Sequence, residues 1–232
     1  MLFSDYVNVY NLFNIILLSY GWYKLAQFLT YLNNNSFKLS RMNVSGVHAL
    51  TVIFFYIFNG SLDLLYFLSL TYYIMDTKYE FDNIFRSTTT INTTTTNTNT
   101  TTTITTTKKI SLYDFGIIVH HILSMILIAY LLDPSVNGYI FYIYFLAEIS
   151  NLPMYLAYHL IHINYSNKKI IRWITIAEAT AFGFCRMYLG SYMAYEIWFI
   201  VDTPMFIIFS SIIMLLISLI WTVKLIVQLK NT

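Results

Sequence analysis

Apolar residues along this chain gather in long runs that are separated by short polar segments. Five of the runs have about 20 residues or more, enough for an α-helix to cross the hydrocarbon core of a bilayer, which is roughly 30 Å thick. These runs are Val7–Leu32, Leu112–Leu132, Tyr139–His162, Ile170–Tyr192 and Pro204–Leu229. The pattern predicts an all-α protein that passes through a membrane several times.

A sixth apolar run, Ser45–Asp76, is too long for a single span. As one helix it would be about 48 Å long, at a rise of 1.5 Å per residue. A turn signal, Asn59–Ser61, lies near its middle. We therefore predict two shorter spans here, Ser45–Phe58 and Leu62–Asp76, which brings the total to seven transmembrane helices.

The positions of the positive charges favour seven spans over six. Cytosolic loops of membrane proteins carry an excess of Lys and Arg. With seven spans, all of the loop cations fall on one side of the membrane, whereas six spans would move Lys38 and Arg41 to the opposite side. We therefore predict that the N-terminus lies outside and that the C-terminus lies in the cytosol.

Composition agrees with a membrane protein. Apolar residues make up 57% of the 232 residues and charged residues 10%, whereas soluble domains carry about 25% charged residues. The net charge of +2 gives no support for a nucleic-acid partner. The single cysteine, Cys185, excludes a disulfide framework and a thiolate metal site.

One segment, residues 87–107, consists almost entirely of Thr and Asn. It has too little apolar surface to offset the entropy lost on ordering, so we predict a disordered cytosolic loop. An expanded insert without a role is the simpler interpretation, and a phosphorylated or partner-binding loop is the alternative.

Ionisable side chains interrupt several of the predicted spans. Such groups cost a few kcal/mol in a bilayer, so each marks a candidate functional site. The fourth span carries His120 and His121 near its midpoint. Polar residues in the fifth span recur at the helical spacing of three and four and form one stripe: Glu148, Asn151, Tyr155, His159 and His162. Because such a stripe cannot face lipid, we expect it to line the bundle interior or a wet cavity.

The sixth span repeats this spacing more weakly, with Thr175, Glu178, Phe182 and Arg186. The rise per residue places four groups at a common depth of about 12–14 Å, namely His120, His121, Glu148 and Glu178. A second set lies nearer the cytosolic face: His48, Asp76, Asp114, His159 and His162. We therefore predict a polar cavity that opens towards the cytosolic leaflet and is closed on the other side.

Structural roles remain an alternative for each of these residues. Asp76 is then a helix cap, His159 an interfacial residue at the end of a span, and Arg186 the partner of a carboxylate in packing. His120 and His121 would form hydrogen bonds between helices. Adjacent side chains on a helix point about 100° apart, so these two histidines do not chelate one ion, and we expect no metal.

Several of these residues occur in an order that resembles the TLC-domain family of membrane proteins. The matching residues are Arg41, the segment Ser45–Ala49 with His48, Asp76 at the end of a tyrosine-rich span, the pair His120-His121, Glu148–Ser150, and Arg186. Within the family, the chain is most similar to the small proteins that have little beyond the domain itself. The resemblance implies an N-terminal helix in residues 1–37 and a domain in residues 38–232. In that domain, six helices form a barrel-like bundle around a central cavity.

A more distant resemblance connects the chain to the ceramide synthases of the same family. Their active site combines a His-His pair with an HDxxD segment, which aligns here with Ala147–Asn151. The resemblance implies that His120, His121 and Glu148 are the catalytic candidates, because a histidine base with a carboxylate suits acyl transfer from a thioester. The third histidine and the second aspartate of the motif are Ala147 and Asn151 in this chain.

Two functions follow as expectations. The first is a protein that binds, senses or transports lipid and influences membrane lipid composition. The second is an intramembrane acyltransferase, with acyl-CoA as co-substrate and no other cofactor. In both, the lipid cavity is expected to include His48, Asp76, Asn151, Tyr155, His159, Glu178 and Arg186. The partner is membrane lipid, a homo-oligomer remains open, and the resemblance implies the endoplasmic reticulum or a related endomembrane.

Overall fold

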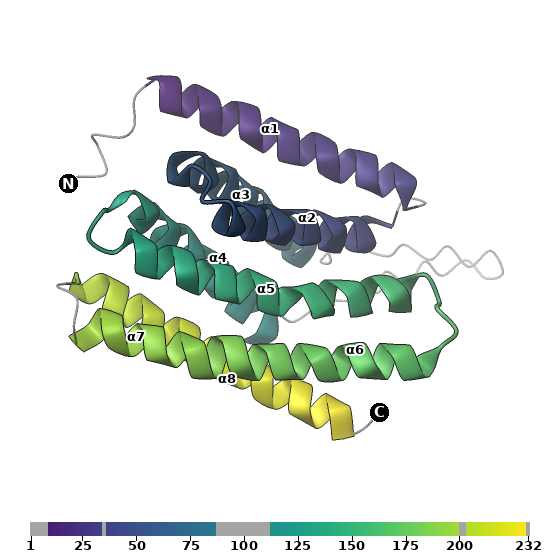
Figure 1. The fold of residues 1–232 in the computed structure, drawn as a ribbon. Coiled ribbons are helices and arrows are strands. Elements are labelled where there is room, and N and C mark those ends of the chain that lie inside the picture. The colour runs from purple at the N-terminus through teal and green to yellow at the C-terminus, as the bar shows by residue number, and fades with distance from the viewer. Residues whose placement is uncertain (1–8, 34–35, 87–111, 200–202, 231–232) are drawn as a thin grey trace, which may run out of the picture.

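The computed structural model describes residues 9–33, 36–86, 112–199 and 203–230, and these form a bundle of long helices (Figure 1). All of the regular structure in these ranges is helical, which confirms the predicted all-α class. The elements are α1 (Val9–Leu32), α2 (Phe37–Ile57), α3 (Leu62–Arg86), α4 (Leu112–Ala129), the short 3-10 turn η2 (Tyr130–Leu132), α5 (Asn137–His162), α6 (Lys168–Ala181), the π-helix η3 (Phe182–Leu189), α7 (Gly190–Phe199) and α8 (Met205–Lys230). The Thr- and Asn-rich segment lies outside the described residues.

The predicted break in the sixth apolar run is confirmed. Helix α2 ends at Ile57, α3 begins at Leu62, and Asn59 between them adopts a left-handed φ of 49°. A Cβ atom at Gly60 would lie 2.6 Å from the Cδ1 atom of Phe55. A side chain at this position would therefore require the Phe55 ring to shift.

The predicted bounds of these two spans were too short. Helix α2 begins at Phe37 rather than Ser45, and α3 continues to Arg86 rather than ending at Asp76. Hydropathy marks the part of a helix that suits lipid, whereas the backbone remains helical through the polar turns beyond it. An exposed ion pair between Lys78 and Asp82, 3.2 Å apart at i and i+4, lies in this extension of α3.

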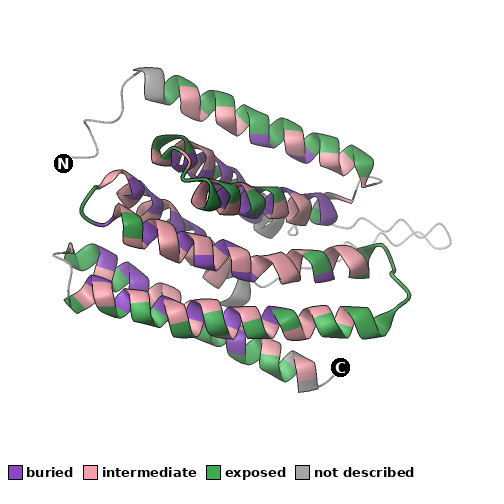
Figure 2. Cartoon of the chain, in the orientation of Figure 1, coloured by how far each residue is buried: buried purple, intermediate pink, exposed green. Residues whose placement is uncertain are grey.

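Three helical segments are long and apolar enough to cross a membrane: Phe115–Leu132, Asn137–His162 and Met205–Val227. Large apolar side chains also lie on the outside of the bundle, and Figure 2 shows exposed residues along most of α1. Leu12, Phe13 and Ile16 are examples. An exterior of this kind suits a lipid environment, in agreement with the predicted membrane protein.

Helices α6, η3 and α7 follow one another without a loop and form a single long rod. Its central part, Phe182–Leu189, is π-helical. Such segments are rare, and they occur frequently at functional sites. The rod runs from Lys168 to Phe199, beyond the predicted span Ile170–Tyr192.

Helix packing brings the polar faces of several helices together. Helix α5 packs against α2 and α6, while α3 packs against α1 and α4, and α8 packs against α4, η3 and α7. Helix α1 lies at the edge of the bundle (Figure 1). Its Trp22 side chain donates a hydrogen bond from Nε1 to the Leu68 carbonyl of α3, at 3.0 Å.

Candidate functional site

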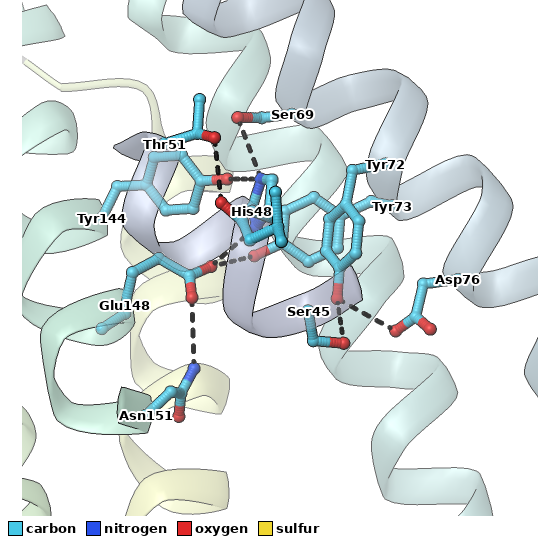
Figure 3. Close-up of polar contacts among 12 residues, drawn as sticks. Ser45, His48, Thr51, Ser69, Tyr72, Tyr73, Asp76, Tyr144, Glu148 and Asn151 are labelled. Atoms are coloured by element: carbon cyan, nitrogen blue, oxygen red, sulfur yellow. Dashed lines mark hydrogen bonds and ion pairs between the residues drawn. The ribbon is translucent and has the colours of Figure 1, made fainter. Parts of the chain in front are cut away.

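His48, on α2, lies at the centre of a buried polar network (Figure 3). Its ring is 1% exposed. The Nε2 atom lies 2.9 Å from the Tyr144 hydroxyl and 3.2 Å from Ser69 Oγ, while Nδ1 lies 3.5 Å from Glu148 Oε1. The Tyr72 ring stacks on the imidazole with a centroid distance of 3.9 Å. His48 therefore joins three helices, α2, α3 and α5.

Glu148, on α5, accepts hydrogen bonds on both oxygens. The Tyr73 hydroxyl donates to Oε1 at 3.2 Å, and Asn151 Nδ2 donates to Oε2 at 3.3 Å. These two donors, with the His48 ring 3.5 Å away, surround a carboxylate side chain that is 4% exposed. The stripe predicted on this helix does face the bundle interior at Glu148 and Asn151.

Arg186, in the π-helical segment η3, is held by α5. Its Nε donates to Ser150 Oγ at 2.8 Å, and Nη2 donates to the Ala147 carbonyl at 3.0 Å and to Asn151 Oδ1 at 2.8 Å. The guanidinium also lies over the Phe182 ring, 4.1 Å from its centroid. Asn151 therefore bridges the two residues, because its amide nitrogen donates to Glu148 and its amide oxygen accepts from Arg186.

A second cluster centres on Asp76, on α3. Arg41 binds it through Nε at 2.6 Å and Nη2 at 3.2 Å, and also contacts Glu80 Oε1 through Nη1 at 2.5 Å. His121 Nε2 lies 3.2 Å from Asp76 Oδ2. The Tyr72 hydroxyl, 2.9 Å from Ser45 Oγ and 3.4 Å from Asp76 Oδ2, connects this cluster to His48.

This geometry shows that Asp76 is no helix cap, since α3 continues for ten residues beyond it. Glu80 was missed by the sequence reasoning because it lies outside the predicted span. A signal was nevertheless present: Tyr72, Asp76 and Glu80 are spaced by four and share one face of a helix.

The adjacent histidines His120 and His121 have different neighbours. Their rings lie 5.7 Å apart, and while His121 contacts Asp76, His120 packs edge-on against Trp221 at 5.2 Å. Among the described residues, the buried Nδ1 atom of His120 has no hydrogen-bond partner. Asp76 is the carboxylate that contacts His121, and His48 is the histidine beside Glu148, while His120 and Glu148 both line the cavity described next.

A cavity of about 100 Å³ lies next to this network, between α4, α5, the rod of η3 and α7, and α8. Its polar end is formed by Tyr73, His120, Glu148, Asn151 and Arg186, and its apolar wall includes Leu127, Ile140, Ala194, Ile197 and Ile207. These apolar residues lie towards the turn between α4 and α5. The sequence predicts a cavity that opens towards the cytosolic leaflet, whereas this cavity extends towards the turn between α4 and α5, which the predicted topology places on the other side of the membrane.

Several residues predicted for the cavity lie elsewhere. His48 and Asp76 belong to the network but do not line the cavity. His159 Nδ1 lies 3.3 Å from Asn43 Oδ1, near the end of α5, and the Tyr155 ring packs beside Gly46. Glu178 is buried, yet it neither lines the cavity nor makes a hydrogen bond or ion pair with another described residue.

Within the described ranges, no group of three or more His, Cys, Asp or Glu side chains is arranged to hold a metal ion. The arrangement instead offers buried hydrogen-bond donors and a guanidinium at the end of an apolar cavity. Side-chain placement of Asp114, which was also predicted near the cytosolic face, lies outside the described residues.

The fold and the site together define a helical membrane protein with a buried polar network beside an apolar cavity. Comparisons of the chain with protein-family models, with curated proteins and with solved structures give no match. The resemblance to the TLC-domain family therefore stays a prediction.

Proposed function

We propose that this protein binds a membrane lipid in the cavity between α4, α5, α7 and α8, and that it senses or moves that lipid and so influences membrane composition. The observation that carries the proposal is the cavity itself, which is apolar along most of its wall and polar at one end. Binding sites for amphiphilic ligands combine a mostly apolar lining with a few placed polar groups.

The length of the cavity supports an acyl chain as its occupant. Its lining on α5 extends from Ile140 to Asn151, which is about 16 Å at 1.5 Å per residue. This is about half of the hydrocarbon core of a bilayer. We place the polar group of one acyl chain beside Asn151 and Arg186 and its chain along this lining; the cavity of about 100 Å³ has to widen to hold the whole chain.

The proposal includes seven membrane spans, with the N-terminus outside and the C-terminus in the cytosol, in an endomembrane. Helices α2 and α3 contain 21 and 25 residues, and at 1.5 Å per residue each is long enough to cross a core of about 30 Å. The one-sided distribution of loop cations supports the orientation. Helix α1 packs against α2 and α3 at the edge, which suits an extra helix beside a six-helix bundle.

Filling the cavity tests the proposal. Ala194 lines the cavity and is 2% exposed, whereas Ala177, on the same rod, is exposed. We expect Ala194→Phe to remove most of the lipid that co-purifies with the protein, measured by mass spectrometry of the extracted lipids. Ala177→Phe should retain it. Equal lipid content in both variants, with both folded by thermal unfolding, would contradict binding at this cavity.

Acyl transfer is the second candidate, and His120 favours it. Its ring lines the cavity, and its Nδ1 atom is buried without a partner among the described residues. An imidazole in this position suits a general base for an amine or hydroxyl that attacks an acyl-CoA thioester. The test is release of free CoA from acyl-CoA with a panel of lipid acceptors. Loss of release in His120→Ala, and its retention in Ala177→Phe, would establish the enzyme.

A further inference from the structure

The charge of Arg186 is not balanced by an ion pair. Its three hydrogen bonds go to neutral acceptors: a hydroxyl, a backbone carbonyl and an amide oxygen. Among the described residues, no carboxylate lies within ion-pair distance, and Nη1 has no hydrogen-bond partner. The side chain is nevertheless only 6% exposed and lines the cavity. A buried charge without a counter-ion is costly, so this end of the cavity favours an anion.

The nearest acidic group does not fill this role. Glu148 already accepts hydrogen bonds from Tyr73 and Asn151 and lies beside His48. Asn151 stands between Glu148 and Arg186 and bonds both. Nη1 of Arg186 is therefore available to a ligand, whereas the Glu148 carboxylate contacts side chains of α2 and α3.

We infer that the ligand of this cavity is a long-chain carboxylate, with its head group on Nη1 of Arg186 and its chain along the apolar wall towards Ile140. This inference rests on the proposed lipid binding. His120 lies at the same polar end and provides a second group for the head group, since a neutral imidazole carries one N–H donor. A carboxylate has two acceptor oxygens, and a guanidinium binds it with charge-assisted hydrogen bonds.

Comparing ligands on the unmodified protein tests the inference without a mutation. The protein, in nanodiscs, is loaded with radiolabelled palmitate, and unlabelled palmitate, hexadecanol, methyl palmitate and palmitoyl lysophosphatidate compete for it. A hydrogen bond to a charged group contributes about 1.5–3 kcal/mol, so palmitate should compete about 10- to 150-fold better than hexadecanol or methyl palmitate. Equal competition by hexadecanol would overturn the carboxylate, and so would tighter binding of lysophosphatidate, which would assign the site to a phosphate.

Variants then assign the selectivity to Arg186. Arg186→Gln should reduce palmitate affinity to about that of hexadecanol, whereas Arg172→Gln, which removes an exposed cation on α6, should not change it. Arg186→Lys should keep part of the preference, because the charge remains without the planar fork. Unchanged selectivity in a folded Arg186→Gln protein would overturn the inference. If that variant does not fold, the ligand comparison above decides.

The same assay separates this inference from the proposed function. Ala194→Phe should weaken palmitate and hexadecanol together, because it fills the space for the chain. Suppose that Ala194→Phe weakens both ligands while palmitate and hexadecanol compete equally well on the unmodified protein. The cavity then binds lipid, but it does not select the head group by charge. If Ala194→Phe changes neither ligand, the proposed lipid site itself fails.

Discussion

Replacing Asp76 by Asn is expected to destabilise the protein strongly, because it removes the charge at the centre of a buried cluster. Asp76 binds Arg41 through two oxygens and contacts His121, and its side chain is 5% exposed. Removing one member of a buried ion pair typically costs 3–5 kcal/mol. Since Arg41 keeps its contact with Glu80 and is 21% exposed, we expect a cost just below that range, about 2–3 kcal/mol.

The chain provides a matched control on the same helix. Asp82 pairs with Lys78 at 3.2 Å, but these side chains are 37% and 69% exposed. Exposed pairs contribute about 0–1 kcal/mol, so Asp82→Asn should change stability little. The measurement is the free energy of unfolding in mixed micelles, obtained by titration with a denaturing detergent. A second arm, Arg41→Met combined with Asp76→Asn, should cost less than the sum of the single changes, because the two residues are in direct contact.

The reasoning would be refuted if Asp76→Asn and Asp82→Asn had equal effects on the free energy of unfolding. Strict additivity of Arg41→Met and Asp76→Asn would likewise contradict a direct interaction between these residues. Both results would mean that the buried pair contributes no more than a solvated one.

Two further predictions concern the turn and the tyrosine network. Gly60→Ala should lower the free energy of unfolding by about 1–3 kcal/mol, because the new Cβ would lie 2.6 Å from a phenyl ring, whereas Gly138→Ala meets nothing within 4 Å and should be nearly neutral. Tyr144→Phe removes the hydroxyl that lies 2.9 Å from the buried imidazole of α2, and should cost about 1–3 kcal/mol by leaving a ring nitrogen less well paired. Tyr142→Phe, on the same helix, is the control. Detergent titration measures all four, and an equal effect of the two glycine or the two tyrosine changes would contradict the corresponding contact.

Local patterns predicted the helical class and the break between α2 and α3. Three apolar segments suited to a membrane were also recognised, because length and hydropathy are properties of neighbouring residues. The ends of α2 and α3 could not be predicted in this way, since hydropathy reports the lipid environment rather than the backbone conformation. Spacing of three and four placed Glu148 and Asn151 on one face of α5, and the structure confirms that they lie together.

The partners of these residues could not be predicted in the same way. Which histidine lies beside Asp76 and which beside Glu148 depends on the rotation and axial position of α2, α3 and α4 relative to one another, and these follow from packing. The π-helical segment adds a further difficulty. Its wider turn changes the direction of Arg186 relative to an ideal α-helix, and no residue pattern in Phe182–Leu189 signals it.

Charge balance distinguishes the two polar clusters and indicates which of them is available to a ligand. Around Arg41, two carboxylates surround one guanidinium, so that cation needs no further partner. Arg186, in contrast, is held by neutral acceptors beside an apolar cavity. Changes at Asp76 should therefore alter stability without altering the preference among ligands, whereas changes at Arg186 should alter that preference in every variant that folds. If substitutions at Asp76 instead changed the preference among ligands, the ligand would bind at Arg41 and not at Arg186.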